Sequence, residues 1–129
     1  MLSLAGGALG VTDVSVYATA STIEVVTSDV DGETRETTIW IVVLEGVPYI
    51  TTSGTTWGEN VERDLRVIVR LADSTRPFDV LFVTGESERT KIHDAFREKY
   101  GFQDKLVSFF IDPAQSRIMK LVDSDGARR

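Results

Sequence analysis

The sequence predicts an α+β fold in which an antiparallel β-barrel carries one short and one long helix. Two observations lead to this fold class. Strand-length runs rich in β-branched and aromatic residues recur along the chain in hairpin order, separated by turn signals. Helical spacing occurs in two places, once after the third strand and once before the last two strands. A sheet closed into a barrel has no exposed edges, so we expect a barrel rather than an open sheet.

Three strands are predicted in the first half of the chain, over residues 23–27, 35–44 and 47–52. Asp31-Gly32 marks the turn between the first two strands, and Glu45-Gly46 marks the next turn. Side chains alternate along a strand, and both faces of the second run are largely apolar. We therefore predict that this run is a central strand covered on both sides.

A short helix is predicted over residues 58–66, because Glu59, Glu62, Arg63 and Arg66 have the spacing that favours ion pairs on a helix surface. Two further strands are predicted at 67–71 and 78–84, joined by a turn cluster at 72–77.

The long helix is predicted over residues 86–100, where apolar side chains follow a one-face pattern. Acidic residues lie in its first turn and basic residues in its last, and Gly101 is suited to end it. A last pair of strands is predicted at 106–111 and 117–122.

The 129 residues, 42% of them apolar, suit a single domain. We expect a loosely packed segment over residues 1–20, a barrel domain over 21–122 and a disordered tail over 123–129. The start of the chain does not predict a secretory signal, because no Lys or Arg precedes Arg35 and Asp13 interrupts the apolar run. We therefore expect a cytoplasmic protein without a membrane span.

Composition excludes several functional classes. The 20 acidic and 14 basic residues give a net charge of -6, which argues against nucleic acid and anionic membranes as partners. Cysteine is absent, so no disulfide, thiolate nucleophile or cysteine-based metal site is possible. The one histidine, His93, is expected on the helix surface or in helix packing. We predict no metal site and no catalytic residue.

The hairpin around Glu45-Gly46 is the best candidate for ligand binding. Its arms carry hydroxyls that could cradle a phosphate-bearing ligand, namely Thr37 and Thr38 on one arm and Thr51, Thr52 and Ser53 on the other. Trp40 is expected to fill the core. Trp57 lies in a hydroxyl-rich loop that enters a helix, where it either fills the core or forms a stacking wall beside an anion. Charge-assisted bonds to a phosphate could come from Arg35, Arg63 and Arg66.

Several segments together resemble a small bacterial domain family of unknown function, over roughly residues 20–122. They are IEVVT (23–27), DG (31–32), TTIWIVV (37–43), GVPYI (46–50), Trp57 and AFREKYG (95–101). That family looks like an offshoot of the FMN-binding split barrels, which include pyridoxamine-phosphate oxidases and deazaflavin-dependent nitroreductases.

The resemblance implies a split barrel of six or seven strands, commonly a homodimer, with cofactor sites at the subunit interface. It implies that the strand from Arg35 to Trp40 lies along a flavin ring, and that Thr51–Ser53 and the Trp57 loop hold phosphate. Related sequences often have an arginine after this hairpin, where this chain has Thr51-Thr52-Ser53, so Arg35 or Arg63 would have to compensate. The predicted cofactor-binding residues are Arg35, Thr37, Thr38, Trp40, Thr51, Thr52, Ser53, Trp57 and Arg63.

Three functional hypotheses remain open. The first, favoured by the resemblance, is a protein that binds FMN or a deazaflavin coenzyme for a redox reaction on a small molecule. The second is a non-enzymatic barrel that binds another small molecule between its subunits. The third is a structural dimeric barrel that has lost flavin binding.

Overall fold

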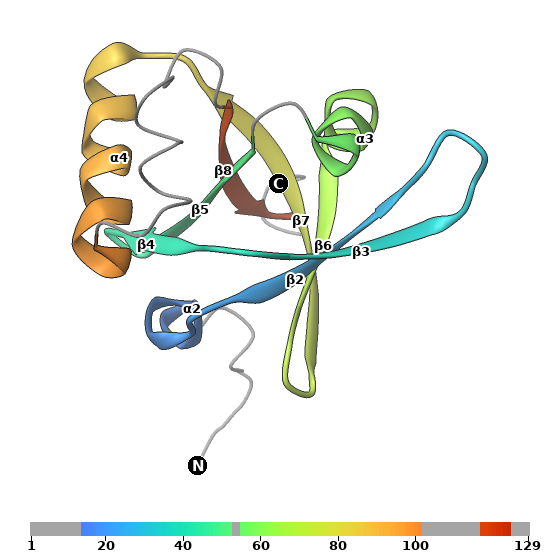
Figure 1. Ribbon diagram of the computed structural model, residues 1–129, viewed down its shortest axis with the longest axis horizontal. Coiled ribbons are helices and arrows are strands. Elements are labelled where there is room, and N and C mark those ends of the chain that lie inside the picture. The colour runs from blue at the N-terminus through green and yellow to red at the C-terminus, as the bar shows by residue number, and fades with distance from the viewer. Residues whose placement is uncertain (1–13, 53–54, 102–116, 125–129) are drawn as a thin grey trace.

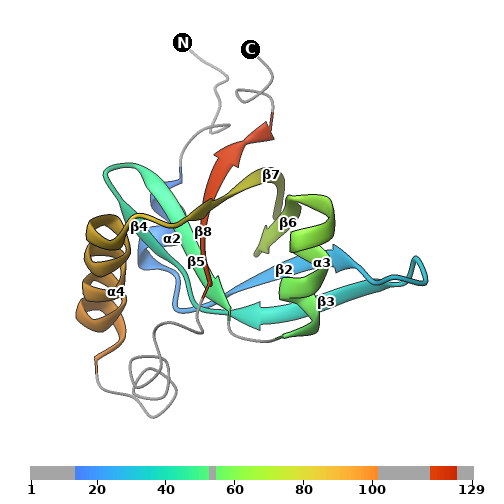
Figure 2. The same cartoon turned by 90° about the horizontal axis from the view of Figure 1, so that it is seen from above.

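A computed structural model describes residues 14–52, 55–101 and 117–124. Its seven antiparallel strands form one curled sheet in the order β3-β2-β6-β7-β8-β5-β4 (Figures 1 and 2). The predicted α+β split barrel is therefore confirmed. The elements in chain order are α2 (Ser15–Thr19), β2 (Ile23–Ser28), β3 (Thr34–Ile39), β4 (Val42–Leu44), β5 (Val47–Thr52), α3 (Thr56–Asp64), β6 (Arg66–Leu71), β7 (Ser74–Val83), α4 (Glu86–Tyr100) and β8 (Arg117–Asp123).

The predicted strand over residues 35–44 is two strands. β3 pairs with β2 and β4 pairs with β5, so the two pieces lie at opposite ends of the sheet. The prediction of a central strand is wrong, and most of β3 is exposed. Its two-sided apolar pattern holds only from Ile39 onward, where alternate side chains pack against two different clusters.

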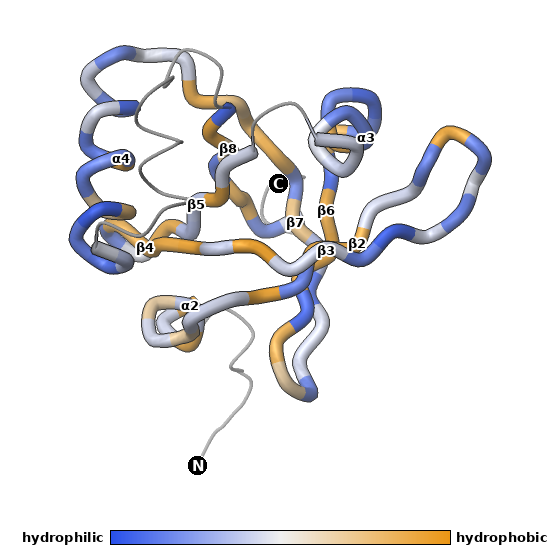
Figure 3. The backbone as a smooth tube through the Cα atoms, in the orientation of Figure 1, coloured by the Kyte–Doolittle hydropathy of each residue, from blue (hydrophilic) through white to orange (hydrophobic). Residues whose placement is uncertain are grey.

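Two apolar clusters hold the sheet. The larger one lies inside the curl of the sheet, where strand residues such as Val25 and Val69 meet Tyr17 from α2 and Trp57 and Val61 from α3. The smaller one lies on the outer face, where Ile92 and Phe96 of α4 pack on β4, β5, β7 and β8. In Figure 3 the tube is apolar along much of β4 and β7 and mostly hydrophilic along the β2–β3 hairpin.

Side chains from the last turn of α4 bond to the backbone at the break between β3 and β4. The hydroxyl of Tyr100 accepts the Ile41 N–H at 3.0 Å, and Lys99 Nζ donates to the Ile41 carbonyl at 2.6 Å and to the Tyr17 carbonyl at 3.1 Å. Burial lowers the pKa of Lys99. We call these contacts the Ile41 clasp. They supply backbone partners where Ile41 has left both ladders.

The turns confirm one prediction and correct another. Glu45 and Gly46 both have positive φ, 53° and 79°, as a two-residue hairpin turn requires, so that prediction is confirmed. The β6–β7 turn is only Ala72-Asp73, and the predicted cluster at 72–77 is too wide. Pro77 lies inside β7, where β8 has not yet begun to pair.

The helices agree with prediction to different degrees. α4 has the predicted bounds. α3 starts two residues early, after its N-cap Thr55, and ends two residues early because Leu65 adopts a left-handed conformation. Arg66 consequently lies on β6, and the expected pairs along the helix are replaced by pairs with β7 and β8. The helix α2 was not predicted.

The predicted strand at 106–111 lies outside the described residues. The domain limits stay a prediction, although α2 and Ser124 pack against the barrel beyond them, with Tyr17 and Ser124 both buried.

Replacing Gly58 with alanine should destabilise the fold, although alanine is the better helix former. A Cβ at Gly58 would lie 2.8 Å from Thr52 Cγ2 and 3.0 Å from Thr55 Oγ1. We expect Gly58→Ala to lower the free energy of unfolding by about 1–3 kcal/mol in urea denaturation. Adding Thr52→Ser removes the clashing methyl and should recover part of the loss. A Gly58→Ala variant as stable as the parent would contradict this packing.

Candidate functional site

Arg35, predicted to hold phosphate, is bonded to the turn of its own hairpin. Its Nε and Nη2 donate to the two carboxylate oxygens of Asp29 at 2.8 and 3.1 Å. The bond from Arg35, followed by one from Asn60, lowers the pKa of Asp29. Arg35 is thus used in a two-point ion pair, the strongest geometry available to its side chain.

Asn60 connects α3 to β2. Its side chain is buried, and Nδ2 donates to Thr27 Oγ1 at 3.0 Å and to Asp29 Oδ1 at 2.8 Å. Its Oδ1 accepts from Arg63 Nη2 at 2.8 Å, and the same nitrogen lies 2.6 Å from the carbonyl oxygen of Ser28. We call Thr27, Ser28, Asp29, Arg35, Asn60 and Arg63 the Asn60 network. Both arginines predicted to compensate for the missing cation belong to it.

The predicted hydroxyls do not form one cradle in the structure. The Thr52 hydroxyl is buried and bonds to that of Thr55, which caps α3 by accepting the Gly58 N–H at 3.1 Å. Thr37 and Thr38 lie on β3 and Thr51 on β5, strands that are not paired with each other. Ser53 lies outside the described residues.

The two tryptophans differ in burial, and Trp40 is more exposed than the expected core position implies. Trp57 is 4% exposed in the inner cluster, so in this structure it packs in the core rather than forming a wall for a ligand. Trp40 is the more accessible of the two. It is half-buried and stacks on Tyr100, with ring centroids 4.3 Å apart and planes 9° from parallel.

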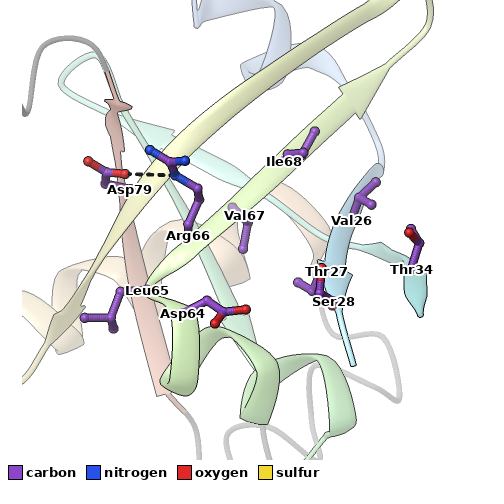
Figure 4. Close-up of a pocket in the computed structure, with 10 residues that line it drawn as sticks. All are labelled: Val26, Thr27, Ser28, Thr34, Asp64, Leu65, Arg66, Val67, Ile68 and Asp79. Atoms are coloured by element: carbon purple, nitrogen blue, oxygen red, sulfur yellow. Dashed lines mark hydrogen bonds and ion pairs between the residues drawn. The ribbon is translucent and has the colours of Figure 1, made fainter. Parts of the chain in front are cut away.

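A groove of about 470 Å³ lies beside the C-terminal end of α3 (Figure 4). Five elements meet there. The residues that line the groove, which we call the α3 groove, are Val26, Thr27, Ser28, Thr34, Asp64, Leu65, Arg66, Val67, Ile68 and Asp79.

The α3 groove combines an apolar floor with polar walls. Val26 and Ile68 are direct cross-strand partners on β2 and β6, and both are half-buried. Arg66 Nε donates to Asp79 Oδ1 at 3.4 Å, and Asp79 also accepts from the Ser124 hydroxyl. The Asn60 network bonds Thr27 and Ser28, so it fixes the β2 wall of the groove relative to α3.

Of these lining residues, only Arg66 was predicted from the sequence as a possible ligand-binding residue. The one sequence signal for the others is that Thr27-Ser28 ends an apolar run on the strand before a turn. The side chains from α3, β6 and β7 carry no pattern that brings them together.

Other chemistry is limited within the parts that the structure describes. No group of three metal-ligating side chains comes together in residues 14–52, 55–101 and 117–124. In the same ranges no helix has the length and apolar character needed to cross a membrane. His93 is half-buried on α4, and burial lowers its pKa.

Comparison with known proteins identifies the fold. No model of a known protein family matches the sequence, and no curated protein matches it. Solved structures do match. A conserved hypothetical protein of Mycobacterium tuberculosis is 18% identical with a TM-score of 0.70, over 92% of this chain and 81% of that one.

Two further structures of the same fold carry functional descriptions. A candidate pyridoxamine 5′-phosphate oxidase of Listeria innocua is 14% identical with a TM-score of 0.66, over 87% of this chain and 90% of that one. A heme storage protein of Vibrio cholerae is 14% identical with a TM-score of 0.65, over 87% and 88%. At these identities the likeness establishes the split-barrel fold.

Replacing Asn60 with leucine, which has a similar size, tests the Asn60 network. The Thr27 hydroxyl would lose its donor and Arg63 and Asp29 would each lose a bond, so we expect about 1–3 kcal/mol lower stability for each buried group left unsatisfied. Chemical denaturation measures the change. The exposed control Thr38→Val should change stability by less than about 0.5 kcal/mol. Equal effects of the two variants would contradict the network.

The lowered pKa of Asp29 predicts a dependence of stability on acid. A carboxyl whose pKa is lower in the folded than in the unfolded state stabilises the fold above its ordinary value of 3.8. That contribution is lost as the pH falls through the folded-state pKa. Arg35→Gln removes the largest cause, so the Asp29 pKa should rise and this part of the acid dependence should shrink.

A carboxyl-carbon NMR titration together with urea midpoints across acidic pH checks this prediction. Arg70→Gln, which breaks exposed pairs with Glu24 and Glu36, is the matched control and should leave the Asp29 titration unchanged.

Proposed function

We propose that this protein is a dimeric split barrel that binds a small organic molecule in the α3 groove without catalysing a reaction on it. The observation that carries this proposal is the convergence of five elements on one groove with an apolar floor and polar walls. Its volume of about 470 Å³ lies in the range of about 300–1,000 Å³ usual for small-molecule sites.

Arg35 and Arg63, the two arginines predicted to hold phosphate, already bond to other residues. Their bonds support ligand binding in the α3 groove rather than at the hairpin. Arg35 and Arg63 would have to leave Asp29, Asn60 and the Ser28 carbonyl before they could hold a phosphate. The groove needs no such rearrangement, because its walls are already fixed by the Asn60 network.

A second copy of the chain is part of the proposal. Among the described elements, α4 covers the outer face near β4, whereas Val26 and Ile68 lie on an outer face that no described helix covers. Leu81 on the neighbouring strand β7 is 55% exposed. A homodimer that buried these three apolar side chains would also close the open side of the groove. The acidic composition and the absence of cysteine are compatible with a cytoplasmic location.

Binding of FMN or a deazaflavin coenzyme for redox chemistry is the second candidate. Trp40 favours it, because this half-buried ring lies just after β3, the strand that the family resemblance expects along the flavin. The residues predicted to bind the flavin phosphate are not placed to do so in this structure, since Arg35 and Arg63 bond to other residues and Trp57 is in the core. The nine residues predicted for this cofactor therefore stay a prediction, and we derive no reaction step from it.

Titration of the purified full-length protein with FMN, FAD, a deazaflavin and hemin separates the two candidates. Under the groove proposal, none of the four should give saturable changes in absorbance or quench tryptophan fluorescence at stoichiometric levels. Under the flavin candidate, binding should be saturable, and Arg35→Ala should weaken it by about 1.5–3 kcal/mol, the range for a charged hydrogen bond.

Two controls make the result decisive. Trp40→Phe should remove quenching by any flavin that stacks there, while Asp64→Asn, at the α3 groove, should not. Stoichiometric flavin binding that depends on Arg35 would overturn the groove proposal. Sedimentation of the protein tests the dimer.

A further inference from the structure

We infer that the α3 groove selects a zwitterionic amino-carboxylate with an apolar body, such as a free amino acid with an aliphatic side chain. This inference rests on the proposed function. It follows from two opposite charges that the structure places at one apolar groove, in residues that no comparison assigns.

Arg66 supplies the end that would bind a carboxylate. Within the described residues it is bonded only through Nε, to Asp79 at 3.4 Å, and its side chain is 49% exposed. No described residue bonds its two terminal nitrogens, which can form the paired bonds that a guanidinium makes with a carboxylate. Arg35 and Arg63 differ in this respect, since their terminal nitrogens already bind Asp29, Asn60 and Ser28.

Asp64 supplies the end that would bind an ammonium group. It is exposed and is the last residue of α3, and it forms no ion pair with any residue in the described ranges. The C-terminal end of a helix carries partial negative charge, which adds to the attraction for a cation. In Figure 4 the Arg66 side chain extends toward Asp79. Asp64 lies on the other side of Arg66, at the end of α3.

The apolar part of the lining lies beside these groups. Val26 and Ile68 face each other across the β2–β6 ladder and line the same groove, to one side of Arg66 and Asp64 in Figure 4. The exposed hydroxyls of Ser28 and Thr34 lie at the rim and can bond to the ligand's polar end.

Charge argues against simpler ligands. The protein carries a net charge of -6, so a ligand with only an anionic group would be repelled at long range. A ligand with only a cationic group would leave Arg66 without an added partner. A zwitterion satisfies both ends without adding net charge to the site.

Leucine and three analogues test the inference on the full-length protein. Isocaproate lacks the ammonium group, isoamylamine lacks the carboxylate and isoamyl alcohol lacks both, while all keep the branched aliphatic body. Methyl NMR signals of Val26 and Ile68 report binding. We expect leucine to bind about tenfold more tightly than either singly charged analogue, since each lacks a charged hydrogen bond.

Two variants test which residue binds the carboxylate and which binds the ammonium group of the ligand. Arg66→Gln should weaken leucine about tenfold and leave isoamylamine unchanged, whereas Asp64→Asn should weaken leucine and leave isocaproate unchanged. Arg70→Gln, on the same strand but outside the groove lining, is the control and should change neither. The thermal midpoint of each variant shows whether the fold is intact.

The outcomes separate this inference from the proposed function. If leucine binds no more tightly than isoamyl alcohol, the groove binds small molecules but the zwitterion inference is overturned. If none of the four probes shifts the Val26 and Ile68 signals, both the inference and the groove proposal fail.

Discussion

The fold depends on how the chain satisfies the backbone of Ile41. β3 and β4 lie at opposite ends of the sheet, and the ladder stops between them. The stop leaves the N–H and C=O of Ile41 without strand partners, and buried backbone groups without partners cost several kcal/mol. Tyr100 and Lys99 bind these two groups from the last turn of α4. The break thus becomes the point at which helix and barrel are joined.

Much of the fold is predictable where local chemistry and tertiary structure agree. α4 has acidic and basic residues at the correct ends and a glycine after it, so its bounds follow from the sequence alone. Prediction fails where residues without a glycine signal take unusual conformations. Leu65 and Ala72 have φ of 57° and 53°, so the helix end and the short turn they form carry no mark in the sequence. The break at Trp40-Ile41 likewise has no glycine or proline to mark it, because it lies inside an apolar run.

The site is less predictable than the fold, because it depends on which charges find partners. Sequence reasoning identified Arg35 and Arg63 as phosphate ligands from their residue type, but Asp29 and Asn60, which bind them, lie in a turn and inside a helix. The α3 groove joins residues from five elements, and only the register of β2, β6 and β7 brings them together. One network therefore both bonds the two predicted arginines and fixes a wall of the α3 groove.

The Ile41 clasp also bears on how the protein folds. Its bonds join residues that are 58, 59 and 82 positions apart, whereas the β4–β5 and β6–β7 hairpins form from neighbouring residues. Contacts of long sequence separation close large loops and lose more chain entropy, so we expect the clasp to form late. Until it does, the Ile41 backbone lacks these partners and the last turn of α4 is not held at the break. The docking of α4 is therefore expected to be among the last steps that complete the barrel.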